Sequence, residues 1–169
     1  MAKYIALLRA VNVGGTGKLA MDKPRSICGE AGFAGVETYI ASGNVVFESK
    51  AALPRVKAEL ERRLHAHVGK PVGVVLRTGP EMAAVLRGNP FPNAMPGCTH
   101  VFFLDQSPPR DALDHAVGRS DEEIRLGDRE IYVYYRNGMG QSKLRIPAAK
   151  TGTARNMNTV AKLAALSAA

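Results

Sequence analysis

Glycine, asparagine and lysine are concentrated in a short stretch that has the composition of an anion-binding loop. The stretch follows an apolar run and contains Asn12, Gly14, Gly15 and Lys18, with Arg9 just before it. Glycines allow backbone N–H groups to approach a ligand closely, and a lysine supplies the opposite charge. The stretch therefore predicts a site for a phosphate or carboxylate group. The alternative is a tight turn without a ligand.

A second stretch, near the C-terminus, has similar chemistry. Ser142 and Lys143 follow two glycines, and Arg155 comes directly before Asn156, with Asn158 two residues further on. Asparagine is a preferred N-cap residue, and a helix N-terminus beside an arginine favours binding of a phosphate or carboxylate. We therefore count these five residues as candidate ligand contacts. Alternatively, Asn156 caps the helix without any ligand.

Positive charge is concentrated at the same two ends of the chain. The 169 residues carry a formal net charge of +8. Residues 1–20 and 131–169 contain lysine and arginine but no acidic residue, whereas residues 21–130 are close to neutral. If the fold brings the two ends together, they form a basic patch that suits nucleic acid or another anion. In the simpler alternative, the charge only aids solubility.

Motifs of the common enzyme classes are incomplete. Residues 15–20 fit a dinucleotide-binding fingerprint, but the strands that follow are expected to form a hairpin and no second crossover unit. His65 and His67 point to different faces of their predicted helix, so they do not share a metal. The adjacent side chains of Ser142 and Lys143 diverge, which argues against a nucleophile and base. We predict no metal and no cofactor, and we assign no catalytic residue.

Three further features bear on cellular location. No apolar run approaches the roughly 20 residues that span a bilayer. The first apolar run contains Arg9 and is expected to be a strand, so it does not resemble a signal peptide. Cys28 and Cys98 are not paired at short spacing. These features predict a cytoplasmic protein with no membrane association and two reduced, buried thiols. The sequence leaves the oligomeric state open.

The elements that must position these loops follow a regular order in the first half. Hydrophobic periodicity and turn residues predict a β-α-β-β-α-β unit. The amphipathic helix of this unit places Leu53, Val56, Leu60 and Leu64 on one face. The predicted strands are 4–11, 36–41, 45–49 and 72–77, and the predicted helices are 21–31 and 53–68.

The second half repeats this order without an obvious final strand. The predicted elements are helix 80–87, strand 101–105, helix 110–117, a hairpin of 122–126 with 130–136, a loop over 137–153 and helix 156–167. The order predicts an α+β fold, a duplicated ferredoxin-like (β-α-β-β-α-β) plait with antiparallel sheets and helices on one face. The N-terminal half, 1–78, and the related C-terminal half, 79–169, are expected to pack together as one compact unit with a shared core.

This plan brings separate motifs to one edge of a sheet. With the strand order 4-1-3-2, the loop after the first strand lies beside the turn between the second and third strands. The glycine-rich loop should therefore lie beside Ser42, Gly43 and Asn44, which we add to the candidate ligand contacts. We further predict that the N-terminal and C-terminal motifs converge into one anion-binding surface, which contains Lys18, Asn44, Lys143 and Arg155.

Four segments resemble the signature stretches of one bacterial family, domain of unknown function 1697. They occur in the family's order and are spread over almost the whole chain: LLRAVNVGG at 7–15, YIASGNVVF at 39–47, GQSKL at 140–144 and ARNMNTVAKL at 154–163. The resemblance implies an α+β protein of ferredoxin-like plan, and it implies no established activity. Where the family usually has an aromatic residue between the last two asparagines, this chain has Met157, so no stacking role is expected there.

Two functions from different classes fit these features. The first is a non-catalytic module that binds an anion or nucleic acid on the basic surface of Gly, Asn, Ser and Lys residues. Against nucleic acid, the third strand lacks the aromatic pattern of an RNA-recognition motif. The second is a small-molecule enzyme or sensor that holds a phosphate- or carboxylate-bearing ligand among the same groups. Steep salt dependence of binding would favour nucleic acid.

Overall fold

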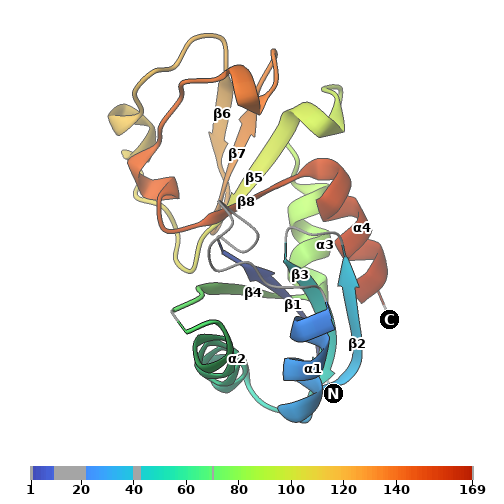
Figure 1. Cartoon of the computed structure of the whole chain (residues 1–169). Coiled ribbons are helices and arrows are strands. Elements are labelled where there is room, and N and C mark those ends of the chain that lie inside the picture. Colours follow the sequence, from blue (N-terminus) through green and yellow to red (C-terminus); the bar gives the residue numbers. More distant parts are fainter. Residues whose placement is uncertain (1, 10–21, 40–42, 70, 169) are drawn as a thin grey trace. The chain divides into compact units, whose positions relative to one another are not determined.

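The computed structural model describes residues 2–9, 22–39, 43–69 and 71–168. These residues form an α+β structure with two four-stranded antiparallel sheets, shown in Figure 1. The chain divides into two compact units. The first unit comprises Met1–Met82 together with Leu163–Ala169, and the second comprises Ala83–Lys162.

The sheet of the first unit has the strand order that the sequence predicts for this half. The order is β2-β3-β1-β4, and each neighbouring pair is antiparallel. The strand predicted over 4–11 begins earlier, at Ala2, and ends at Leu8, with residues 10 and 11 outside the described range. The bounds are β1 (Ala2–Leu8), β2 (Ala34–Tyr39), β3 (Asn44–Ser49) and β4 (Val74–Thr78).

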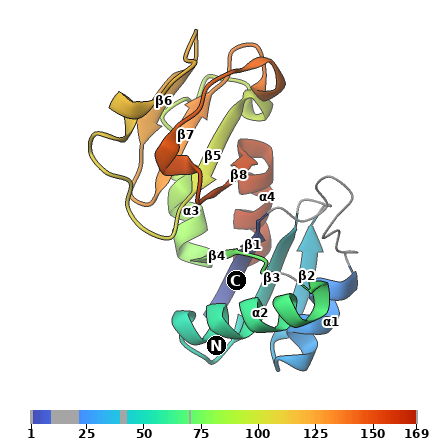
Figure 2. The same ribbon diagram turned by 60° about the vertical axis from the view of Figure 1, so that its left-hand side comes forward.

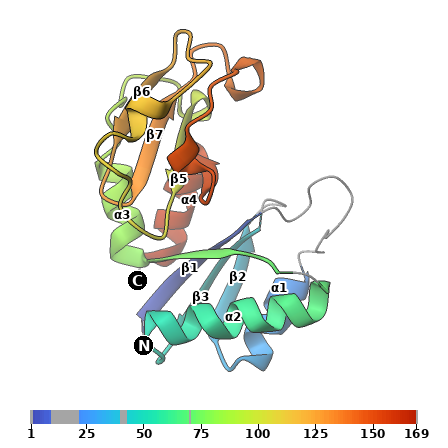
Figure 3. The same ribbon diagram turned by 90° about the vertical axis from the view of Figure 1, so that its left-hand side faces the viewer.

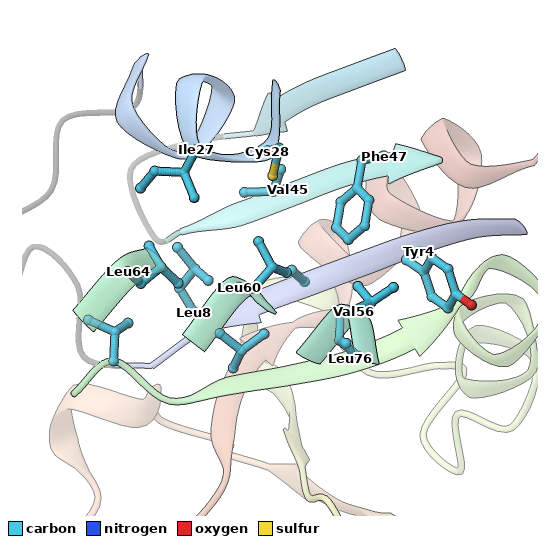
Figure 4. Close-up of a cluster of buried hydrophobic side chains, with 13 residues drawn as sticks. Tyr4, Leu8, Ile27, Cys28, Val45, Phe47, Val56, Leu60, Leu64 and Leu76 are labelled. Atoms are coloured by element: carbon cyan, nitrogen blue, oxygen red, sulfur yellow. The ribbon is translucent and has the colours of Figure 1, made fainter. Parts of the chain in front are cut away.

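Helices α1 (Asp22–Glu30) and α2 (Leu53–Val68) cover one face of this sheet (Figure 2, Figure 3). The helix predicted over 53–68 is confirmed, and Val56, Leu60 and Leu64 are buried, as the amphipathic pattern requires. They belong to one cluster with Ile27 and Cys28 of α1 and with side chains of the sheet (Figure 4). Burial of each such aliphatic side chain contributes about 1.5–3 kcal/mol, so this cluster holds both helices on the sheet.

The second unit contains a sheet with the corresponding order, β6-β7-β5-β8, which is also antiparallel throughout. Its strands are β5 (Thr99–Phe103), β6 (Glu123–Leu126), β7 (Glu130–Tyr134) and β8 (Thr153–Asn156). A separate buried cluster, which includes Ile124, Ile131, Val133 and Ile146, lies in this unit. The single core that we predicted for the two halves stays a prediction.

Strand β8 corrects the expectation that the second half lacks a fourth strand. Thr153–Asn156 pairs with β5, and the register places Arg155 opposite Val101. The segment, Thr-Ala-Arg-Asn, has no alternation of apolar and polar residues, so periodicity alone does not reveal it. Main-chain pairing with a distant strand makes it part of the sheet.

The prediction of an α-helix over 110–117 is also wrong. The structure has only a 3-10 helix, Ala112–His115, whose bonds include Ala112 N–H to the Pro109 carbonyl at 3.0 Å. Two prolines precede this segment, and Gly118, with a φ of 71°, follows it. So short a segment contains too few residues to offset the cost of starting an α-helix.

One more α-helix follows the last strand of each sheet. Helix α3 (Gly79–Arg87) follows β4, and helix α4 (Met157–Ser167) follows β8. Both have capped N-termini. The Thr78 hydroxyl accepts from the Glu81 N–H, the Glu81 carboxylate accepts from the Thr78 N–H, and the Asn156 side chain accepts from the Thr159 N–H at 3.0 Å. In the part of the chain that the structure describes, no helix combines the length and apolar character needed to cross a membrane.

Candidate binding site in the second unit

The turn before β3 lies beside the end of β1, as the predicted topology requires. The Leu8 N–H donates to the Gly43 carbonyl at 2.9 Å, and the register places Asn44 opposite Leu7. Asn44 is fully buried, and its side-chain amide donates to the Tyr39 carbonyl at 3.1 Å. Gly43 has a φ of 79°, which favours glycine. These contacts give both residues a role in the turn itself.

Five further candidate ligand contacts belong to the glycine-rich loop and to the turn before β3. Asn12, Gly14, Gly15, Lys18 and Ser42 lie outside the described residues. Convergence of Lys18 with the C-terminal motif therefore stays a prediction.

Arg9 is half-buried at the end of β1. Its backbone N–H donates to the Gly73 carbonyl at 2.9 Å. A Cβ atom at position 73 would lie 3.0 Å from the Arg9 Cδ, so the arginine stem packs closely against this glycine.

Arg155 is a buried residue of the second sheet. It is 6% exposed, and its Nη1 donates to the Thr153 hydroxyl at 2.7 Å and to the Ala154 carbonyl at 2.9 Å. Burial lowers the pKa of the guanidinium to about 10. Asn156 caps α4, and Asn158 is exposed in the first turn of that helix. Arg155 and Asn156 thus have local structural partners.

Ser142 and Lys143 line a polar pocket of about 270 Å³ in the second unit. The segment before β6, residues 135–138 after β7 and residues 141–143 form its walls. Its polar lining includes Asp121, Glu122, Asn137, Gln141, Ser142 and Lys143. Two of the residues predicted as ligand contacts therefore meet in one pocket.

Glu122 anchors the loop that carries Ser142. Its carboxylate accepts hydrogen bonds from the Ser142 hydroxyl and, at 2.6 Å, from the Ser120 N–H. These bonds, the one from Ser142 above all, hold the pKa of Glu122 below its ordinary value. The Ser142 Oγ in turn accepts from the Leu144 N–H at 3.1 Å. Glu122 is therefore ionised at neutral pH, and the Ser142 hydroxyl is engaged as both donor and acceptor.

The remaining charges of the pocket differ in their pairing. Asp121 accepts from the Asn137 amide at 2.8 Å, and Arg136 forms an ion pair with Glu123 at 2.6 Å. The ammonium group of Lys143 has no hydrogen-bond or ion-pair partner among the residues that the structure describes. Lys143 is therefore the cation of this pocket that is available to a ligand.

The sequence reasoning missed the carboxylates of this pocket. It expected the acid-free C-terminal segment to form a basic surface without any carboxylate, but Asp121 and Glu122 line the same pocket as Lys143. No local signal identifies them, because they lie in the nearly neutral middle of the chain. They reach the pocket through the pairing of β6 with β7.

A larger and more apolar hollow of about 630 Å³ shares two lining residues with this pocket, Tyr135 and Ser142. Its other lining residues include Val117, Met139, Leu144, Ile146, Arg145 and Lys150. One wall is fixed by the backbone pair of Val117 with Arg145, whose two N–H···O bonds measure 2.9 and 2.8 Å. The pocket and the hollow thus adjoin at Tyr135 and Ser142.

Tyr135 is buried between the two spaces and stays protonated. Burial and the nearby charge of Glu122 raise the pKa of its phenol to about 12. The His100 ring lies edge-on against it, with ring centroids 5.4 Å apart. The buried His100 Nδ1 has no hydrogen-bond partner among the residues that the structure describes, and burial lowers the pKa of the imidazole. Both rings are therefore neutral at pH 7 and supply packing rather than charge.

These observations define an α+β protein with two antiparallel sheets and a ligand-sized hollow in its second unit. The chain belongs to the family described as Protein of unknown function (DUF1697), whose sequence model matches residues 1–132. Two of the four segments that carry the resemblance, at 140–144 and 154–163, lie beyond the matched residues. No curated protein matches the chain.

A solved structure has the same fold. It is that of a conserved bacterial protein, SP0830, from Streptococcus pneumoniae, with a TM-score of 0.82 and 23% sequence identity over 98% of each chain. At this identity the similarity concerns the fold alone.

Proposed function

We propose that the second unit binds a small molecule through a carboxylate or phosphate group at Lys143. The observation that carries this proposal is that Lys143 lines the 270 Å³ pocket and that its ammonium group has no partner within the described residues. A charge-assisted contact with an anion is worth about 1.5–3 kcal/mol. The Gln141 side chain lines the same pocket and can add a hydrogen bond.

A small ligand is better supported than a polyanion such as nucleic acid. Asp121 and Glu122 line the pocket together with Lys143, and Glu123 is the next residue, so a long chain of phosphates would meet carboxylates near Lys143. Arg155 is buried, so its guanidinium is withdrawn from such a surface. One anionic group on a compact molecule needs only the space around Lys143.

Binding is also better supported than catalysis. Ser142 is engaged by Glu122 and Leu144, and the lowered pKa of Glu122 makes it a weak base at neutral pH. A sensor or carrier role follows more directly from this arrangement than an acyl- or phosphoryl-transfer reaction.

An NMR titration of ¹⁵N-labelled protein with sodium acetate and sodium phosphate tests the proposal. We expect saturable shifts of the amides of residues 137–144 and roughly tenfold weaker binding in Lys143→Gln, the loss expected for a charge-assisted contact. Lys50→Gln, which removes an exposed lysine of the first unit, serves as the matched control and should bind as the wild type does.

Two outcomes would contradict the proposal. One is a set of shifts that fail to saturate or that persist unchanged in Lys143→Gln. The other is tight binding of a single-stranded oligonucleotide that falls steeply with salt and is unaffected by Lys143→Gln. The second result would favour the nucleic-acid function instead.

We also propose that both halves derive from the ferredoxin-like β-α-β-β-α-β plan. The corresponding strand orders, β2-β3-β1-β4 and β6-β7-β5-β8, support this proposal, as does the capped helix that follows the fourth strand of each sheet. In the second half, 3-10 helices, among them Ala112–His115 and Pro147–Ala149, stand where the plan has α-helices.

A cytoplasmic location is part of the same proposal. Cys28 and Cys98 are both free thiols, the state expected in a reducing compartment. Recovery of both thiols in reduced form from cells would support this location, and a mixed disulfide at either cysteine would contradict it.

A further inference from the structure

We infer that the ligand is an amphipathic anion, a carboxylate or phosphate group joined to an apolar chain or ring. The inference rests on the proposed function, because it places the charged group at Lys143. It goes further because the polar pocket shares Tyr135 and Ser142 with the apolar hollow. A ligand whose charged end meets Lys143 can therefore extend past Ser142 into the hollow.

The hollow presents apolar side chains to water. Three large apolar residues are strongly exposed in the described part of the chain, and two of them, Val117 at 59% and Met139 at 40%, line this hollow. Further apolar residues of the lining are Phe102, Leu144, Ile146, Pro147 and Ala149. Because removal of such surface from water is favourable, an apolar ligand group gains free energy by covering it.

The charged residues around the hollow favour a negatively charged ligand. Arg145 and Lys150 line the hollow, and its described lining contains no acidic residue. The two carboxylates lie in the polar pocket, where Glu122 is bonded to Ser142 and Asp121 to Asn137. This distribution complements an anionic amphiphile and disfavours a cationic one.

The dimensions favour a small molecule as the occupant. Ligand pockets for small molecules measure about 300–1,000 Å³, and the hollow of about 630 Å³ lies within that range. The bonded pair of Val117 and Arg145 holds one wall in place without a ligand, so the space is formed before binding. A preformed space of this size and lining suits an acyl or aromatic acid.

The test compares octanoate, acetate and 1-octanol in the same NMR titration. We expect octanoate to bind at least about tenfold more tightly than either acetate or 1-octanol, since only octanoate combines the charge with an apolar chain. Octanoate should also shift the amides of residues 117, 145 and 146, which line the hollow and lie outside the segment that acetate is expected to shift. The double variant Val117→Thr/Met139→Gln changes no charge. It should lose most of the additional affinity for octanoate and keep the affinity for acetate. Met95→Gln, at an exposed methionine outside both spaces, is the matched control.

The outcomes separate the two proposals. If acetate binds at Lys143 and octanoate binds no more tightly, the proposed function stands and the amphipathic ligand is overturned. Equal binding of octanoate and 1-octanol, or an unaffected double variant, overturns it as well. If neither acid binds, the proposed function itself is overturned, and the inference falls with it.

Discussion

The hydroxyl of Ser142 donates a hydrogen bond to the carboxylate of Glu122, which lies 20 residues earlier in the chain. This bond joins the glycine-rich loop after β7 to the segment that leads into β6. It also brings a carboxylate from the neutral middle of the sequence against the acid-free C-terminal motif. The polar pocket around Lys143 exists in this form because the two segments are tied together here.

Glu122→Gln should lower the free energy of unfolding by about 1–2 kcal/mol at neutral pH, because it removes the charge from these hydrogen bonds. The folded-state pKa of Glu122 lies below its ordinary value of 4.5. The stabilisation is therefore complete above 4.5 and is lost as the pH falls through the lower folded-state value. Urea unfolding of wild type and variant across acidic pH measures the difference.

The matched control for Glu122→Gln is Asp128→Asn, at an exposed acidic residue in the β6–β7 turn. Its effect on stability should stay within about 0.5 kcal/mol. If the free energies of unfolding of wild type and Glu122→Gln still differ at the lowest pH, the charge of Glu122 does not account for the stabilisation.

Gly118→Ala should destabilise the second unit much more than Gly138→Ala. Both glycines have positive φ, 71° and 84°, so each substitution carries backbone strain of about 1–3 kcal/mol. A Cβ atom at position 118 would in addition lie 2.2 Å from the Lys143 carbonyl, whereas nothing lies within 4 Å of one at position 138. Thermal unfolding of the two variants gives the comparison, and equal losses would contradict the close approach.

Arg155→Ala and Lys143→Gln should have opposite consequences. Arg155→Ala removes a buried side chain with its hydrogen bonds to Thr153 and Ala154, so we expect a loss of about 2–3 kcal/mol in stability and unchanged acetate binding. Lys143→Gln should weaken binding and change stability by less than about 0.5 kcal/mol. If Arg155→Ala weakens acetate binding at a temperature where the variant is fully folded, Arg155 contributes to the binding site and this prediction is wrong.

Cys98 should react with a thiol reagent in the folded protein, and Cys28 should not. The prediction of a buried thiol is confirmed for Cys28, which is 1% exposed and whose pKa burial raises to about 12, and is wrong for Cys98, which is half-buried. Almost no reactive thiolate of Cys28 exists near neutral pH. Labelling with Ellman's reagent should therefore show one fast thiol, and the Cys98→Ser variant should show none until it is unfolded. Fast labelling of that variant would contradict the burial of Cys28.

The sequence by itself determined the elements whose residues carry a local periodic signal. The α2 helix follows from the four-residue spacing of Val56, Leu60 and Leu64, and the turn at Gly43 follows from its residue types, because such signals depend only on neighbours along the chain. The order of the first sheet follows from these elements, since few connections of a β-α-β-β-α-β unit are compact. The placement of Asn156 as a helix cap belongs to the same group.

Only the tertiary structure decided the features that depend on pairing between distant segments. β8 is a strand because β5 supplies its hydrogen-bond partners, and Arg155 is buried because that strand belongs to the sheet. Glu122 meets Ser142 because β6 pairs with β7 and the loop after β7 folds back. The distribution of charge along the chain does not reveal this contact. Electrostatic contacts form between groups that are close in space, and proximity in space is a property of the whole fold.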